Sequence, residues 1–297
     1  MLVPPLLRKS DLSEQSEMKL DGLLTSTSCK MFSRTLLFGP YMGELGHEVR
    51  TWAPYVRTLV VRAKKKDIYT RCIAISWLGR NLLYPGCMFM NYDSWKAPNW
   101  MMHNPPMLGT MWAKEQYKPD EWYQPEPGGR AALGKYPKTY FRVCKPWKPT
   151  RYLKSIVLFA RDRQDGVGPD RNYPHWEEVV CQLRDQFPRL NIVSAGLLRG
   201  NEHIKGTRDV RVSALSPSLD AARYHIARAS LVLGESSGTM HFALAMCGRP
   251  VCLICKPSGA KRYTEQDNWW NVPCRVLVAK NFGGVKPSRV VEEVLKF

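Results

Sequence analysis

The second half of the chain alternates apolar runs with amphipathic segments, and this alternation constrains the fold more than any other feature. The apolar runs lie at 155–160, 191–197, 231–234, 251–255 and 276–279. Between and after them, apolar residues recur at helical spacing over 176–187, 219–229, 239–247 and 288–296. Strands joined by helices run parallel, because each helix carries the chain back across the sheet. We therefore expect a doubly wound α/β domain over 155–297.

The first half opens with a similar unit. Residues 35–38 predict a strand, a glycine-rich turn follows over 39–46, and apolar spacing predicts a helix over 49–60. Pro54 lies inside the helical pattern, so we expect this helix to be kinked or to begin late. Residues 73–77 predict a second buried strand.

Composition divides the chain into four regions. Residues 1–30 show weak periodicity and predict a disordered extension. Residues 31–135 are expected to form an N-terminal Rossmann-like domain, with an irregular insertion at 84–130 that carries seven prolines and four tryptophans. Residues 136–154 predict a basic linker to the domain at 155–297.

The net charge of +18 indicates a polyanionic partner, with nucleic acid slightly favoured over an anionic surface glycan. A merely basic enzyme is the alternative. No apolar run approaches the roughly 20 residues of a membrane helix. Arg8 and Lys9 follow the first apolar run, which does not fit a signal peptide. We expect a cytoplasmic protein of a bacterium or of a virus-infected host cell, with the irregularly spaced cysteines as free thiols.

The strongest functional signal is the loop at 234–241, GESSGTMH. A buried strand ends there and a helix begins, so the free N–H groups of the first helical turn favour an anion. Ser236, Ser237 and Thr239 add hydroxyls, Gly238 lets the backbone approach a ligand, and His241 follows one turn later. This pattern predicts a diphosphate site. The alternative is a well-capped helix, because serine and threonine are preferred N-caps.

Three arginines follow the first strand of the same domain. Arg161 and Arg163 lie at the exit of the predicted strand, and Arg171 comes shortly after. Their guanidinium groups suit phosphate, and strand exits face the ligand cleft of an α/β sheet. We assign all three to the predicted diphosphate site together with Gly196, at the end of the next strand. The alternative for the arginines is ordinary surface charge.

The run ARASLVLGESSGTMHFALAMCGRPVCLI, which ends at Ile254, resembles the donor-site segment of GT-B glycosyltransferases, especially the ADP-heptose lipopolysaccharide heptosyltransferases. The resemblance implies two Rossmann-like domains that face each other across a cleft. It also implies a nucleotide-sugar co-substrate, no metal and no other cofactor. Ser236, Ser237, Gly238 and Thr239 would then hold the diphosphate. The family often has Asp where this chain has Ser236, which leaves open the group that orients the donor.

The turn at 39–48 carries the candidate catalytic residues. Met42-Gly-Glu is similar to the turn in which the heptosyltransferases place the acidic base that deprotonates the acceptor hydroxyl, with Glu44 in place of Asp. Inverting transfer needs such a base and stabilisation of the leaving diphosphate. His47 and Glu48 are rival bases. Glu44 could instead serve only as a favourable acid at a helix N-terminus.

The acceptor is the least determined part of the prediction. The residues assigned to the acceptor side are Gly43, Gly46, Lys64, Lys65, Lys66, Lys145 and Trp147. Basic and aromatic groups suit a hydroxymethylated base in phage-type DNA. The alternatives are lipopolysaccharide synthesis, a nucleotide-sugar epimerase or pyruvyltransferase on the same fold, and a non-catalytic basic binding protein. The chain has no Asp-x-Asp, HExxH, Walker or GxGxxG motif, which disfavours metal-dependent and nicotinamide enzymes.

Overall fold

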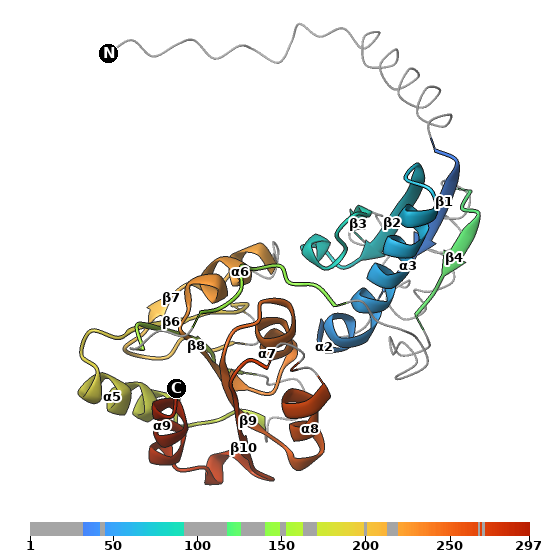
Figure 1. Ribbon diagram of the computed structural model, residues 1–297. Coiled ribbons are helices and arrows are strands. Elements are labelled where there is room, and N and C mark those ends of the chain that lie inside the picture. The colour runs from blue at the N-terminus through green and yellow to red at the C-terminus, as the bar shows by residue number, and fades with distance from the viewer. Residues whose placement is uncertain are drawn as a thin grey trace, which may run out of the picture.

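The computed structural model contains two parallel sheets, each with its own helices (Figure 1). It describes residues 32–41, 45–91, 118–125, 140–148, 153–162, 171–198, 201–212, 219–266, 268 and 271–297. The expected N-terminal extension at 1–30 lies outside this part of the chain, as does most of the expected insertion at 84–130. No helix within the described ranges has the length and apolar character needed to cross a membrane.

The first sheet has the strand order β3-β2-β1-β4, with all neighbouring strands parallel. Its strands are β1 (Arg34–Phe38), β2 (Thr70–Ser76), β3 (Met88–Asn91) and β4 (Glu121–Tyr123). Its helical segments are α2 (Leu45–His47), the π-helix η1 (Glu48–Trp52), α3 (Ala53–Lys66) and the 3₁₀ turn η2 (Asn81–Leu83). Because α2, η1 and α3 are contiguous, Pro54 lies inside a helical run, and the π-helical turn of η1 directly precedes α3.

The second sheet has the order β10-β9-β8-β5-β6-β7 and is also parallel throughout. Its strands are β5 (Ser155–Phe159), β6 (Asn191–Ser194), β7 (Arg208–Asp209), β8 (Leu231–Glu235), β9 (Val251–Cys255) and β10 (Cys274–Val278). Counted along the chain from β5, this is the Rossmann order 3-2-1-4-5-6.

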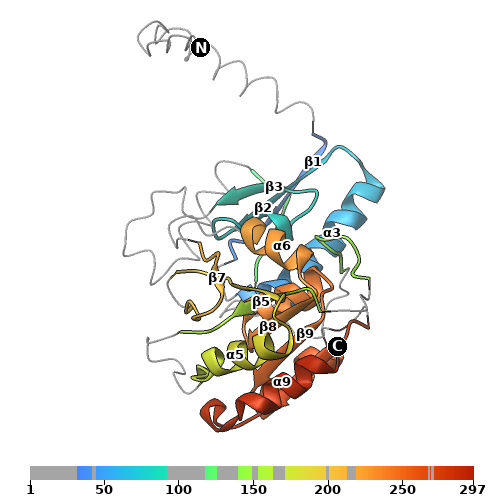
Figure 2. The same ribbon diagram turned by 90° about the vertical axis from the view of Figure 1, so that its left-hand side faces the viewer.

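Helices cover both faces of the second sheet (Figures 1 and 2). They are α5 (Trp176–Gln186), α6 (Leu219–Arg228), α7 (Gly238–His241) with the π-helix η7 (Phe242–Met246), α8 (Pro257–Lys261) with η8 (Arg262–Gln266), the turn η9 (Phe282–Gly284) and α9 (Pro287–Leu295). Alternate residues of β5 face opposite layers. Ile156 and Leu158 pack with α5 and α9, whereas Val157 and Phe159 belong to the core around α6 and η7.

The predicted α/β fold is confirmed, and the elements that carry a strong apolar period lie where the sequence places them. The expectation of an irregular segment over 84–130 is wrong at both ends, because β3 and β4 lie within it and pair with the first sheet. β7 and α8 were also not predicted. Each of these elements is five residues or shorter, and a segment of that length carries too little periodicity to be recognised.

The two sheets meet at the N-terminal ends of α2 and α7. A Cβ built on Gly238 would lie 2.9 Å from the backbone nitrogen of Gly46 and 2.9 Å from Cβ of Leu45. A second contact joins the loop after β2 to α6, where Leu219 N donates to Gly79 O at 3.1 Å. One hydrophobic core continues from β1 and α3 into η7. The predicted catalytic turn therefore adjoins the predicted donor loop.

Candidate functional site

The loop after β8 lies at the switch point of the second sheet. β8 and β5 are neighbours, and the strand order runs outward from them in both directions. In open parallel sheets, ligands bind beyond the carboxyl ends of the strands at this point. Ser236 and Ser237 follow β8 directly, and Gly238 begins α7. The sequence prediction of a ligand loop thus falls where the topology places a ligand crevice.

The hydroxyls of this loop bond to other side chains rather than cap the helix. Ser237 occupies the N-cap position, but its side chain makes no capping hydrogen bond. Its Oγ shares a 2.8 Å hydrogen bond with Oγ1 of Thr239. Ser236 Oγ shares one of 2.9 Å with the hydroxyl of Tyr263, whose ring stacks on His241 at 4.2 Å. The simple capping interpretation therefore does not explain the serines.

Arg171 reaches the serine loop, whereas Arg161 contributes its backbone. Arg171 Nη2 donates to the carbonyl of Ser236 at 3.2 Å. The backbone N–H of Arg161 donates to Oε2 of Glu235 at 3.0 Å. Arg163 lies outside the described residues. The arginine at the loop is thus Arg171, and Arg161 remains only a predicted phosphate ligand.

Glu235 is a site residue that sequence reasoning missed. Its carboxylate is fully buried and accepts from three donors: Arg161 N, Tyr173 N at 2.9 Å, and the indole N–H of Trp176 at 2.9 Å. The carboxylate therefore connects the end of β8 to the chain segments on either side of 163–170. The signal available in the sequence was an acid at the end of a buried strand, directly before the serines.

Burial raises the pKa of Glu235 from 4.5 to about 7, against the opposing effect of its hydrogen bonds. A raised carboxyl pKa means that this group favours folding below its unfolded pKa. That contribution is lost as the pH rises through about 7.

We expect the Glu235→Gln variant to show a flatter dependence of stability on pH. The wild type should lose about 3 kcal/mol relative to the variant between about pH 4 and about pH 8. Urea unfolding across that range measures the change, and any constant cost of the amide cancels in the slope. Parallel profiles for the two proteins would contradict the assignment.

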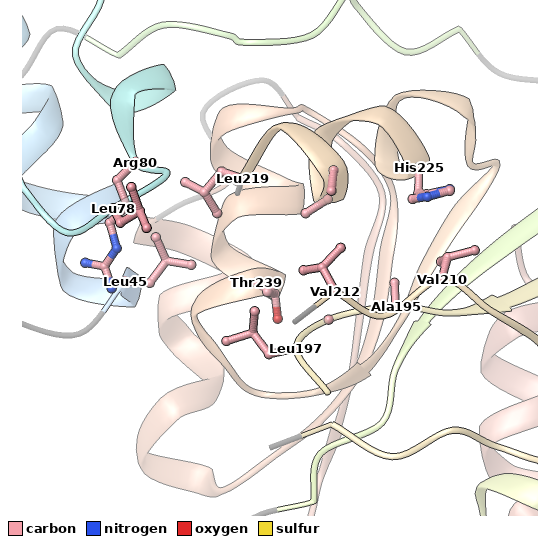
Figure 3. A pocket seen from close by; sticks show the side chains of 13 residues that line it. Leu45, Leu78, Arg80, Ala195, Leu197, Val210, Val212, Leu219, His225 and Thr239 are labelled. Carbon is pink, nitrogen blue, oxygen red and sulfur yellow. The ribbon is translucent and has the colours of Figure 1, made fainter. Parts of the chain in front are cut away.

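An apolar cavity of about 130 Å³ adjoins the loop and lies between the two sheets (Figure 3). Thr239 of the donor loop and Gly196, which follows β6, both line it. Gly196 has a φ of +117°, a conformation that favours glycine. The first sheet's unit contributes Leu45, Leu78 and Arg80. The cavity is therefore built jointly by both units and opens beside the first turn of α7.

On the other side of the contact, only part of the predicted catalytic turn is described. Gly43 and Glu44 lie outside the described residues. His47 ends α2 and is half-buried. A Cβ on Gly46 would lie 3.2 Å from Cδ2 of His241, so the backbone of α2 lies against the donor-side histidine.

Glu48 is wrong as a candidate base. Its side chain is fully buried and accepts hydrogen bonds from Ser76, Arg80 and Tyr84. Burial raises its pKa despite the ion pair with Arg80. A carboxylate enclosed by three donors has no access to an acceptor hydroxyl. It instead holds the loop after β2, whose Arg80 lines the cavity.

The structure does not bring the remaining acceptor-side residues to this cavity. Lys64, Lys65 and Lys66 form the last turn of α3. The helical run formed by α2, η1 and α3 separates them from the α2 contact by about 30 Å. Lys145 and Trp147 lie in the connecting segment, where the carbonyl of Lys145 accepts from buried Arg249 at 2.9 Å.

The arrangement of the two sheets is shared with known structures. No protein-family model and no curated protein matches the sequence. ADP-heptose lipopolysaccharide heptosyltransferase II of E. coli matches at a TM-score of 0.56 and 12% identity, over 89% of this chain and 98% of that one. A family 9 glycosyl transferase from Veillonella parvula DSM 2008 matches at 0.52 and 10% identity, over 90% and 97%.

The chain has the GT-B fold. A third GT-B structure, the dodecameric iron-containing heptosyltransferase TibC in complex with ADP-D-β-D-heptose, matches at a TM-score of 0.51 and 13% identity, over 90% of this chain and 77% of that one. In the part of this chain that the structure describes, there is no group of three or more His, Cys, Asp or Glu side chains that could hold a metal ion.

Proposed function

We propose that this protein transfers a sugar from a nucleoside diphosphate sugar to a hydroxyl group, with inversion and without a metal ion. The observation that carries the proposal is the loop at Ser236–Thr239. It lies at the switch point of a Rossmann sheet, its hydroxyls are not used for capping, and Arg171 is beside it. The GT-B fold supports the same reaction class, since the matched structures named above are glycosyltransferases.

In this proposal the donor lies across the loop and the cavity. The diphosphate takes the N–H groups at the start of the nine-residue helical segment formed by α7 and η7. The nucleoside or the sugar occupies the apolar cavity, which Thr239 of the loop helps to line. Arg171 and the loop stabilise the negative charge that develops on the leaving diphosphate.

The base that activates the acceptor is proposed to be Glu44, with His47 as the alternative. Glu44 directly precedes Leu45, which packs against Gly238 of the donor loop. His47 is on the same short helix as Leu45. A base is needed on this side of the cleft because the acceptor hydroxyl loses its proton as the new bond forms.

We expect replacement of Arg171 by alanine to weaken nucleoside diphosphate binding at least tenfold. A charge-assisted hydrogen bond to phosphate contributes about 1.5–3 kcal/mol. The measurement is thermal stabilisation by UDP, GDP, ADP and CDP without added metal, followed by titration with the best nucleotide. Ser237→Ala should weaken binding less, because it removes a neutral group.

Arg189→Ala is the matched control, since Arg189 is an exposed arginine that follows the C-terminal end of α5, whereas the first residue of α5 contacts Glu235 beside the loop. It should bind like the wild type. If a folded wild-type protein is stabilised by none of these nucleotides, the transferase proposal fails and a non-catalytic binding protein becomes the better interpretation.

The acceptor is proposed to be a polyanion, because the chain carries a net charge of +18. The proposal that the acceptor is a hydroxymethylated base in phage-type DNA rests on this charge alone. A phosphorylated surface glycan has further support in the names of the matched heptosyltransferases. Transfer of labelled sugar to hydroxymethylated DNA and to truncated lipopolysaccharide, in parallel reactions, separates the two.

A further inference from the structure

The end of the first unit that is remote from the donor loop gathers exposed apolar side chains. Nine large hydrophobic side chains are exposed among the described residues, and four of them are Phe32, Val61, Ile68 and Tyr69. Ile68 is the most exposed of the nine, at 74%, and Tyr69 follows at 61%. Their concentration distinguishes this end of the molecule, because the other five are distributed over the rest of both units.

These side chains lie together rather than merely close in sequence. Arg34 pairs with Thr70 in the register of β1 and β2, and the guanidinium of Arg71 lies over the Phe32 ring at 5.5 Å from its centroid. Ser33 donates a hydrogen bond to Asp67. Val61 precedes this turn on α3, and Figures 1 and 2 both show that β1 begins at the end of the unit that points away from the second sheet.

A basic rim accompanies the apolar side chains. Residues 61–71 contain five basic side chains and one acid; the basic ones are Arg62, Lys64, Lys65, Lys66 and Arg71. Arg62, Lys65 and Lys66 are exposed. The acid, Asp67, accepts from the Ser33 hydroxyl and from Tyr69 N at 2.9 Å. Nearby Glu121 is paired with Arg34. Both acids are thus bound to groups of the chain itself, and positive charge predominates at this end of the first unit.

We propose that this distal patch, formed by Phe32, Val61, Ile68 and Tyr69 with the basic residues of 62–66, docks on an anionic lipid bilayer. In this arrangement the side chains of Val61 and Ile68 insert at the boundary between the headgroups and the acyl chains. The tyrosine ring lies at the membrane–water interface, and the basic side chains contact the anionic headgroups. The docking adds to the proposed transfer reaction and does not depend on it.

Other occupants fit these residues less well. Nucleic acid offers phosphates to the lysines and bases to Tyr69 and Phe32, but it offers no apolar medium to Ile68 and Val61. A second copy of the chain would bring two lysine-rich rims together on proteins that each carry a net charge of +18. A lipid surface is the partner that uses both the aliphatic tips and the charge.

Docking in this way has a geometric consequence. α2, η1 and α3 together run from the domain contact to the patch, so the cleft would lie on the order of 30 Å from the lipid surface. The reacting hydroxyl would therefore stand clear of the headgroup layer.

The test is flotation of the full chain with vesicles of phosphatidylcholine alone or mixed with phosphatidylglycerol. We expect binding to the anionic vesicles only, declining with added salt. The variant Ile68→Ser/Tyr69→Ser should bind about tenfold more weakly. The variant Arg62→Gln/Lys65→Gln/Lys66→Gln should bind on the order of a hundredfold more weakly, as expected for about 1 kcal/mol per cation.

Matched controls carry the same changes elsewhere. Leu198→Ser/Val278→Ser removes two exposed apolar side chains outside the patch, and Lys205→Gln/Lys280→Gln/Lys286→Gln removes three exposed lysines. Both should bind vesicles like the wild type. No donor is present, so failure here is distinct from failure of the proposed transfer reaction, which the nucleotide titrations test.

Three outcomes would overturn the proposal. The first is a wild type that does not float with anionic vesicles at low salt, and the second is an equal loss in the control variants. The third is that the patch variants lose binding to a partner other than the vesicles. In that case the patch variants bind vesicles normally but lose binding to DNA, or change from dimer to monomer in sedimentation.

Discussion

Replacing Glu235 by alanine is expected to lower the free energy of unfolding by about 3–5 kcal/mol, because three buried donors lose their acceptor at about 1–3 kcal/mol each. The donors are Arg161 N, Tyr173 N and the indole of Trp176. Part of the cost is offset, since near pH 6 the carboxyl is ionised in the unfolded chain and its burial disfavours that charge. Chemical unfolding near pH 6 measures the difference.

The effect should extend to ligand binding. Glu235 is the residue before Ser236, and two of its donors belong to the strand exit at Arg161 and to the segment that carries Arg171. Loss of the carboxylate should therefore also weaken nucleoside diphosphate binding in the fraction that remains folded.

Glu178→Ala is the control for this substitution. Glu178 is on α5, its side chain is 61% exposed, and it pairs only with His175 at 3.0 Å. Exposed ion pairs contribute about 0.5 kcal/mol. A Glu235 variant that is no less stable than the Glu178 variant would show that water replaces the carboxylate without cost.

The sequence predicted the second sheet well because its elements are long and strongly patterned. α5 carries Trp176, Val179, Val180 and Leu183 on one buried face, and β9 is buried at every position. Such patterns arise from burial itself. β4, by contrast, has three half-buried residues, Glu121, Trp122 and Tyr123, and is recognisable only from its pairing with β1.

The site was predictable where it depends on the local chain and unpredictable where it depends on tertiary contacts. Ser236 to Thr239 follow a strand and start a helix, so their position at the switch point could be read from neighbours in sequence. Tyr263 lies 26 residues from Ser237, and nothing near it in sequence indicates that its hydroxyl bonds the serine loop. The burial of Glu48 likewise depends on Ser76, Arg80 and Tyr84, which belong to later elements.

This distinction also explains why the lysines at 64–66 were assigned to the acceptor side. Charge is visible in sequence, but its direction on the fold is not. These lysines form the last turn of α3, and only the structure reveals that this end of the helix is remote from the cleft.

The contact between the two units provides the second large prediction, the substitution Gly238→Ala. The new Cβ would lie 2.9 Å from Gly46 N and 2.9 Å from Leu45 Cβ, which is closer than carbon atoms approach in proteins. Rotation of the Leu45 side chain leaves its Cβ in place, so Leu45 and the backbone of Gly46 can yield only if α2 moves away from α7. Overpacking of this kind costs about 1–3 kcal/mol.

The same movement should reduce transfer activity on the order of a hundredfold, because displacement of the catalytic turn by about 1 Å can have that effect. Nucleoside diphosphate binding should change much less, since Arg171 and the serine hydroxyls remain in the second unit. Activity assays and nucleotide titrations on one protein sample separate the two effects.

Gly284→Ala is the matched control, because a Cβ at that position meets nothing within 4 Å. It should leave stability, nucleotide binding and transfer unchanged. If Gly238→Ala also leaves transfer unchanged, the close contact of α2 with α7 is not needed during the reaction. If it abolishes nucleotide binding as completely as transfer, the added Cβ itself blocks the diphosphate at the start of α7, and the defect lies in the donor site rather than in the approach of the two units.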